Sequence, residues 1–173
     1  PPQDTSSAAS DVYKRQLDAY SILYEYGLST EFEDEVEEEA KKISSIITKE
    51  EVKKRRDMRG ELTFTIDPVD AKDFDDAILC KKLKMGYKLL VAIADVSSLV
   101  RPGSAIDKAA KERGTSIYFP NTVIPMLPEE ISNDLCSLVP NKIRNVVVSD
   151  ITFDTDGEIK DYDFYEAKIE SKY

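Results

Sequence analysis

A short stretch of the chain is crowded with aspartate. Five aspartates fall between positions 67 and 76: Asp67, Asp70, Asp73, Asp75 and Asp76. Carboxylates this close repel one another unless positive charge lies among them. Mg²⁺ takes oxygen ligands and is usually held by a few carboxylates together with substrate phosphates. The stretch therefore suggests metal-assisted chemistry on a phosphate ester.

The alternative interpretation of this stretch is an ordinary acidic turn, because many Asp-rich loops are solvated turns or helix caps. Two neighbouring features favour a held cluster. Phe74 is expected to point into the core and anchor the loop, and apolar strand patterns lie on both sides, at 62–66 and 77–84. An acid cluster between buried strands would be held on rigid elements, as a metal site requires.

Composition removes most other catalytic chemistries. The 173 residues suffice for one domain with a core, and they include no histidine, which excludes Ser-His-Asp catalysis and His-ligated zinc. Cys80 and Cys136 are far apart in apolar sequence, so we expect reduced core thiols in a reducing cytoplasm. No run approaches the roughly 20 apolar residues of a membrane span. Carboxylate-bound Mg²⁺ or Mn²⁺ is the main option left.

The net charge of −10 is unusual for a nucleic-acid binder, which normally carries a basic patch. The charges are unevenly distributed, however. Seven of the nine residues from 31 to 39 are acidic, whereas 53–56 and Arg59 form a basic block. The global charge therefore says little about the local field at the acid cluster.

The first third of the chain is expected to be helical. Residues 1–16 have the composition of a disordered or foreign tail. Apolar spacing predicts a helix over 17–28 and a second one along the acidic run, with Thr30 as its N-cap. A capping-box pattern at 48–51 predicts a further short helix. We interpret residues 17–60 as a helical linker region preceding a domain.

From residue 62 the chain is expected to be rich in β-structure. Turn signals at 84–87 and at Asp156-Gly157 predict two hairpins. A helix is predicted over 104–113, with Ser104 as its N-cap, and a short one over 129–135, after a proline-marked linker. The mixture predicts an α+β (mixed α/β) domain. The expected strands are 62–66, 77–84, 87–95, 115–119, 146–154 and 158–168.

Several longer motifs resemble a known family. Asp67-Pro-Val-Asp-Ala-Lys-Asp-Phe-Asp-Asp-Ala is similar to the signature of the RNB catalytic domain of the ribonuclease II/ribonuclease R family. Segments 93–97, 113–120, 123–138 and 166–172 agree with the same family in the same order. The resemblance runs from about residue 24 to the end of the chain and is closer to the ribonuclease R branch.

The resemblance implies a 3′→5′ exoribonuclease that hydrolyses single-stranded RNA to nucleoside 5′-monophosphates with Mg²⁺. It implies an RNB-type mixed sheet, a cytoplasmic location, and neither DNA nor a membrane as partner. Asp67, Asp73 and Asp76 correspond to metal-holding acids and Asp75 to the catalytic aspartate. Tyr118 corresponds to an aromatic residue that stacks near the 3′-terminal nucleotides; the alternative is a core tyrosine.

Some interpretations stay open at this point. The chain lacks the later arginine-rich segment of the family, so 61–173 reads as the N-terminal part of the catalytic domain, which could be inactive by itself. The rival function is a non-catalytic RNA- or protein-binding domain with a structural cation site. Asp95 is either a polar strand-end residue or a support for the acids. The segment 121–139 either covers the core or forms a wall of an RNA channel.

Overall fold

The structure is a computed structural model that describes residues 21–43, 54–69, 71–119 and 122–172. The predicted tail 1–16, the first part of the helix predicted over 17–28 and the capping-box helix at 48–51 lie outside the described residues. Residues 21–25 are helical, as predicted. None of the described helices is long and apolar enough to cross a membrane.

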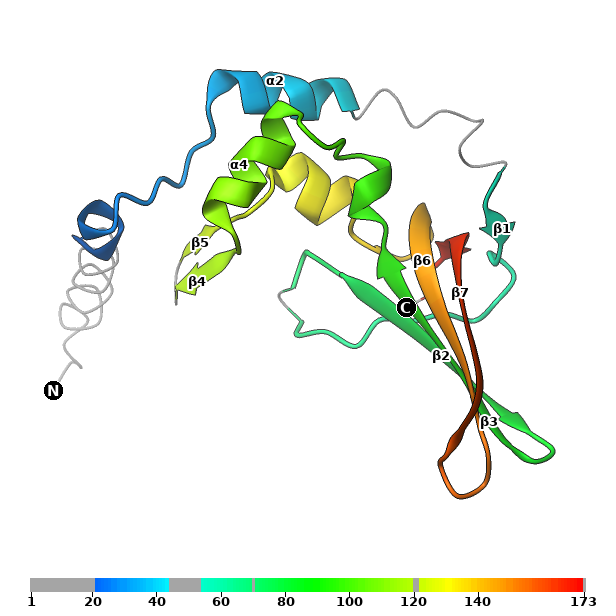
Figure 1. Cartoon of the computed structure of the whole chain (residues 1–173). Coiled ribbons are helices and arrows are strands. Elements are labelled where there is room, and N and C mark those ends of the chain that lie inside the picture. Colours follow the sequence, from blue (N-terminus) through cyan, green and yellow to red (C-terminus); the bar gives the residue numbers. More distant parts are fainter. Residues whose placement is uncertain (1–20, 44–53, 70, 120–121, 173) are drawn as a thin grey trace, which may run out of the picture.

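A five-stranded sheet forms the centre of the fold, with strand order β1-β7-β6-β3-β2 (Figure 1). β1 runs parallel to β7, and the other neighbouring strands are antiparallel. β4 (Ile117–Phe119) and β5 (Thr122–Ile124) form a separate hairpin. The predicted mixed sheet is confirmed. Its strands are β1 (Arg56–Asp57), β2 (Asp76–Leu83), β3 (Gly86–Ala94), β6 (Ile143–Phe153) and β7 (Ile159–Glu170).

Both predicted hairpin turns are present and project from the same end of the sheet (Figure 1). Gly86 has φ 111°, and a Cβ atom there would lie 2.0 Å from the carbonyl oxygen of Phe153, so only glycine fits. In the other turn, the Asp154 carboxylate accepts hydrogen bonds from the backbone N–H groups of Asp156 and Glu158. Local turn chemistry thus fixes the register of both long hairpins.

The helices lie at the opposite end of the sheet (Figure 1). α4 (Ala105–Arg113) begins as predicted, because the Ser104 side chain accepts a hydrogen bond from the Asp107 N–H. The segment predicted as a short helix is a π-helix, η2 (Glu130–Leu135). A 3₁₀ turn, η1 (Val96–Ser98), follows β3.

The acidic helix begins later than predicted. α2 spans Asp34–Ile43, so the prediction of Thr30 as its N-cap is wrong. The Ser29 hydroxyl instead bonds the backbone of Glu31 in a local turn, which keeps this part of the chain out of helical geometry. Acids in the first turn of α2 and lysines in its last turn still suit the helix dipole.

The prediction of a strand at 62–66 is wrong. Only Phe64 pairs with β2, in a single bridge to Ile78. Thr63 is buried and its carbonyl accepts a hydrogen bond from Lys172 N–H, while Leu62 and Ile66 are exposed. The backbone at Thr63 is therefore bonded to the C-terminal segment, so the chain does not follow β2. Conversely, β5 forms within the segment predicted as an extended linker.

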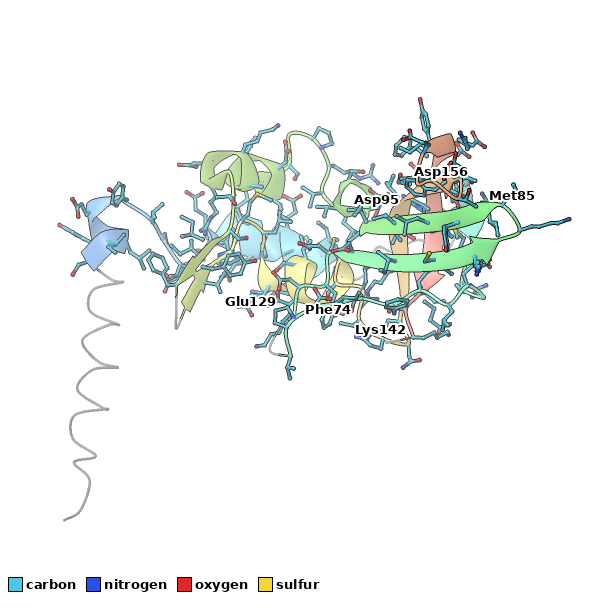
Figure 2. All side chains as sticks on the ribbon, turned by 90° about the horizontal axis from the view of Figure 1, so that it is seen from below. Phe74, Met85, Asp95, Glu129, Lys142 and Asp156 are labelled. Atoms are coloured by element: carbon cyan, nitrogen blue, oxygen red, sulfur yellow. The ribbon has the colours of Figure 1, made fainter. Side chains whose placement is uncertain are left out.

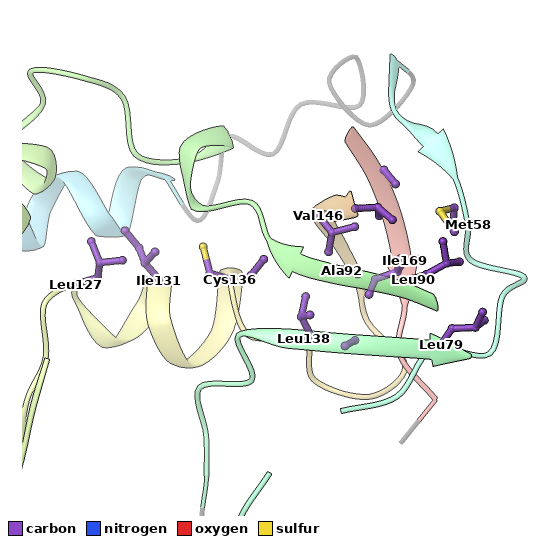
Figure 3. Packing of buried hydrophobic residues seen from close by; sticks show 14 of the residues in the cluster. Met58, Leu79, Leu90, Ala92, Leu127, Ile131, Cys136, Leu138, Val146 and Ile169 are labelled. Atoms are coloured by element: carbon purple, nitrogen blue, oxygen red, sulfur yellow. The ribbon is translucent and has the colours of Figure 1, made fainter. Parts of the chain in front are cut away.

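The segment after β5 continues the hydrophobic core past the end of the sheet (Figure 3). Val146 and Ala92 from the sheet belong to the same core cluster as Leu127, Ile131 and Leu138. This segment therefore covers the core, as one of its two interpretations held. α2 adds Val36 and Ala40, and β7 adds Ala167 and Ile169.

The two cysteines are free thiols, but only Cys136 is a core residue. Burial raises the pKa of the Cys136 thiol to about 12. Cys80 is exposed, so its prediction as a core thiol is wrong. Successive residues of a strand point to opposite faces, and in β2 the buried face belongs to Ala77 and Leu79.

Candidate active site

The acids singled out from the sequence lie where the chain enters β2. Asp76 is the first residue of β2 and pairs with Ile93 of β3, while Asp67, Asp73 and Asp75 belong to the preceding loop. Asp73 is half-buried, and the other three are exposed. Asp70 lies outside the described residues. We call residues 67–76 the acid loop.

The last part of the acid loop is fixed through its backbone. The Phe74 N–H donates to Ser137 Oγ at 3.1 Å, and the Phe74 carbonyl accepts from Leu138 N–H at 2.9 Å. The Asp75 carbonyl accepts from Ala94 N–H at 2.9 Å. Phe74 packs against the core cluster, which confirms its predicted anchoring role. In Figure 2, Phe74 and Asp95 lie at the end of the β2–β3 hairpin opposite Met85.

The carboxylates of the acid loop act on one another. The pKa of Asp75 is raised, first by partial desolvation of its carboxyl and then by the negative charges of Asp73, Asp76 and Asp67. Within the described ranges, no lysine or arginine forms an ion pair with any of these four acids. The described part of the loop therefore carries negative charge that no ion pair with a described lysine or arginine offsets.

These residues fit a hard cation by donor type, because carboxylate oxygens are the ligands that Mg²⁺ prefers. Among the residues that the structure describes, no three acids or cysteines are gathered closely enough to form a metal-binding group. The assignment of a metal to Asp67, Asp73 and Asp76 therefore stays a prediction. The mutual repulsion at Asp75 is the feature that a bound cation would relieve.

Tyr118 joins the acids from a distant part of the chain. It lies on β4, and its hydroxyl donates a hydrogen bond to Asp73 Oδ2 at 2.8 Å. This bond is the largest cause of the raised pKa of Tyr118. The residue is 65% exposed, which excludes the alternative of a core tyrosine. The structure thus brings together two residues that were predicted from separate motifs.

Asp95 has a structural role that the sequence left open. It is buried at the end of β3, and its carboxylate accepts hydrogen bonds from Arg55 at 2.5 Å and Ser97 at 2.6 Å. Burial alone would raise the pKa of Asp95, but the hydrogen bonds from Ser97 and Arg55 and the Arg55 charge outweigh burial and lower it. Arg55 belongs to the basic block 53–56, and nothing in the local sequence indicated that it pairs with Asp95.

Two further arginines of the basic block are also engaged within the fold. The Arg56 guanidinium lies 4.4 Å from the centre of the Tyr165 ring, and Arg59 forms an ion pair with Asp57 at 2.6 Å. The Arg56 contact joins β1 to β7, whereas the Arg59 pair is local to the end of β1. A pocket of about 560 Å³ lies elsewhere, between α4 and the segment before α2, and none of the four acids lines it.

The model of the RNB domain family matches residues 55–173. The chain belongs to the RNB family. Ribonuclease R of Aquifex aeolicus is 46% identical over 152 residues, which cover 87% of this chain and 22% of that protein. The predicted resemblance to the family, and to its ribonuclease R branch, is confirmed.

Solved structures share the fold of this RNB chain. Mycoplasma genitalium RNase R in complex with ribose-methylated single-stranded RNA superposes with a TM-score of 0.87 at 42% identity, over 91% of this chain and 25% of that one. The yeast pseudonuclease Ssd1 superposes with a TM-score of 0.65 at 24% identity, over 72% of this chain and 16% of that one, and so shows the fold alone. The chain thus spans about a quarter or less of these relatives.

Proposed function

We propose that this RNB chain contributes the acidic part of the active site of a cytoplasmic 3′→5′ exoribonuclease. Its substrate is single-stranded RNA and its products are nucleoside 5′-monophosphates. The observation that carries the proposal is the acid loop itself. Four aspartates lie in one loop whose last part is anchored to the core, the charges of three of them act on Asp75, and the exposed Tyr118 is bonded to Asp73.

In the proposed reaction, water attacks the phosphorus of the last phosphodiester of the RNA. The bond from phosphorus to the 3′ oxygen of the preceding nucleotide breaks, and that oxygen takes up a proton. The terminal nucleotide leaves with the phosphate on its 5′ oxygen. Asp75 orients or activates the attacking water, and its anchored backbone keeps its carboxylate at a fixed place at the edge of the sheet.

Asp67, Asp73 and Asp76 hold Mg²⁺, with Mn²⁺ as a possible substitute. When bound, divalent ions would offset the charge of the phosphate and of the acids and help to activate water. The Tyr118 ring is exposed beside Asp73, so it can stack on a base near the 3′ end without reading its identity. This arrangement suits a sequence-tolerant nuclease.

The test uses the complete natural polypeptide that carries this chain, hereafter the complete protein. A 5′-labelled single-stranded RNA is incubated while Mg²⁺ or Mn²⁺ is titrated against a chelator. We expect a ladder that shortens from the 3′ end, with release of 5′-monophosphates that depends on the metal. Binding of RNA without degradation at any metal concentration would instead support the non-catalytic alternative with a structural cation site.

A further inference from the structure

The Ser137 side chain forms hydrogen bonds with the backbone of the acid loop. Ser137 follows η2 and is fully buried. Its hydroxyl donates to the Lys72 carbonyl at 2.7 Å and accepts from the Phe74 N–H at 3.1 Å. These two backbone groups stand on either side of Asp73. One buried hydroxyl therefore bonds the peptide groups that set the direction of the Asp73 side chain.

The next residue, Leu138, also forms a hydrogen bond with the backbone of the acid loop. Leu138 N–H donates to the Phe74 carbonyl at 2.9 Å, and the Leu138 side chain is fully buried in the core. The peptide that leads from Phe74 into Asp75 is thus bonded to Leu138, while the two preceding peptides are bonded to Ser137. A buried hydroxyl with both partners satisfied defines a single local geometry, because breaking it leaves polar groups without partners.

Ser137 is itself held by a buried cation. Arg144, near the start of β6, donates from Nε to the Ser137 carbonyl at 2.9 Å. Another guanidinium nitrogen donates to Asp134 Oδ1 of η2 at 2.7 Å. Arg144 therefore fastens the C-terminal end of η2 to the sheet through a planar fork, a geometry that lysine cannot reproduce.

We propose that Ser137 is a positioning residue for the acid loop and that Arg144 acts through it. The hydroxyl of Ser137 holds the backbone on both sides of Asp73 in the geometry that metal binding and hydrolysis need. The inference rests on the proposed function. Groups that orient metal ligands from behind commonly change metal affinity or activity by about 10–100-fold when they are removed.

The test compares Ser137→Ala with Ser132→Ala in the complete protein. Ser132 is a matched control, because among the described residues its hydroxyl bonds only to the Pro128 carbonyl and the Asn133 side chain, within its own segment. Three quantities are measured: Mn²⁺ affinity without RNA, kcat and KM on single-stranded RNA over a range of Mg²⁺ concentrations, and hydrogen exchange around Phe74.

For Ser137→Ala we expect Mn²⁺ affinity and kcat at limiting Mg²⁺ to fall by about tenfold or more, with KM within about twofold. Saturating Mg²⁺ should restore much of kcat, and exchange around Phe74 should accelerate. Ser132→Ala should leave all three quantities near their wild-type values. If the two variants behave alike although the wild type degrades RNA, the positioning role is wrong and the proposed function stands.

If the wild type neither binds Mn²⁺ nor degrades RNA, the proposed function fails, and the positioning role for metal and hydrolysis fails with it. Should Ser137→Ala not fold, Arg144→Lys takes its place, because it keeps the positive charge but loses the fork. We expect weaker Mn²⁺ binding and faster exchange around Phe74 from that variant as well. Unchanged values of both would overturn the proposal.

Discussion

Two aspartate sites at neighbouring strand ends have opposite electrostatic environments. Asp95, which follows β3, is buried with Arg55 and its pKa is lowered below the ordinary value. Asp75, which precedes β2, is exposed among other acids and its pKa is raised. Because the fold supplies a cation to one carboxylate and more carboxylates to the other, we assign Asp95 to stability and Asp75 to function.

The largest expected effect is on turnover. Asp75→Asn in the complete protein should lower kcat by about a thousandfold or more, because the loss of a catalytic carboxylate removes its contribution to the transition state. RNA affinity should stay close to wild type, and thermal stability at neutral pH should be equal to wild type or slightly higher, since an uncharged side chain relieves repulsion in the loop. Single-turnover cleavage, RNA binding and thermal unfolding are the measurements.

The matched control for Asp75 is Asp156→Asn, which changes an exposed acid in the β6–β7 turn, far from the acid loop (Figure 2). Turnover by that variant should be unchanged. Cleavage by Asp75→Asn within tenfold of wild type would remove Asp75 from its catalytic role.

The second effect falls on stability. Asp95→Asn should lower the free energy of unfolding by about 3–5 kcal/mol, because it leaves the buried Arg55 charge with only the longer contact to the exposed Glu166 at 3.8 Å. Asp57→Asn is the control, since the Asp57 carboxylate is half exposed in its pairs with Arg59 and, at 3.4 Å, with Lys168, and pairs at the surface contribute about 1 kcal/mol or less. Denaturant unfolding measures both. Equal losses of unfolding free energy in the two variants would mean that the buried Asp95–Arg55 pair stabilises the fold no more than an exposed pair does.

The same comparison explains what could be read from the sequence. The acid loop, Phe74 and Tyr118 were found because their signals are local motifs, and both hairpins and the α4 cap follow from turn and capping chemistry at single positions. Arg55 as the partner of Asp95 was missed, because the two residues are 40 positions apart and only the packing of β1 on β7 brings them together. The strand at 62–66 failed for the same reason: a distant contact, from Lys172, decided its path.

The third expected effect concerns RNA affinity. Tyr118→Ala should weaken binding of single-stranded RNA by about 1–3 kcal/mol, the contribution of one stacked base, whereas Tyr118→Phe keeps the ring and should bind within about twofold of wild type. Tyr162→Ala is the control, because Tyr162 is equally exposed but lies on β7. Equilibrium binding without added metal is the measurement. A loss for Tyr118→Phe as large as for Tyr118→Ala would assign the effect to the hydroxyl bonded to Asp73 instead of to stacking.

The smallest effect is a pH dependence that separates the two kinds of acid. The folded-state pKa of Asp95 is lowered, so its ionisation stabilises the fold fully at pH values above the ordinary aspartate pKa, and this contribution is lost as the pH falls toward the folded-state value. The difference in unfolding free energy between wild type and Asp95→Asn should therefore be constant near neutral pH and shrink below about pH 4.

For Asp75 the sign is reversed. Its pKa is raised, so its ionisation destabilises the fold, and Asp75→Asn should gain unfolding free energy relative to wild type as the pH rises through the acidic range. Denaturant unfolding from acidic to neutral pH gives both differences, and parallel curves for the two variants would show that these carboxylates do not differ in electrostatic environment.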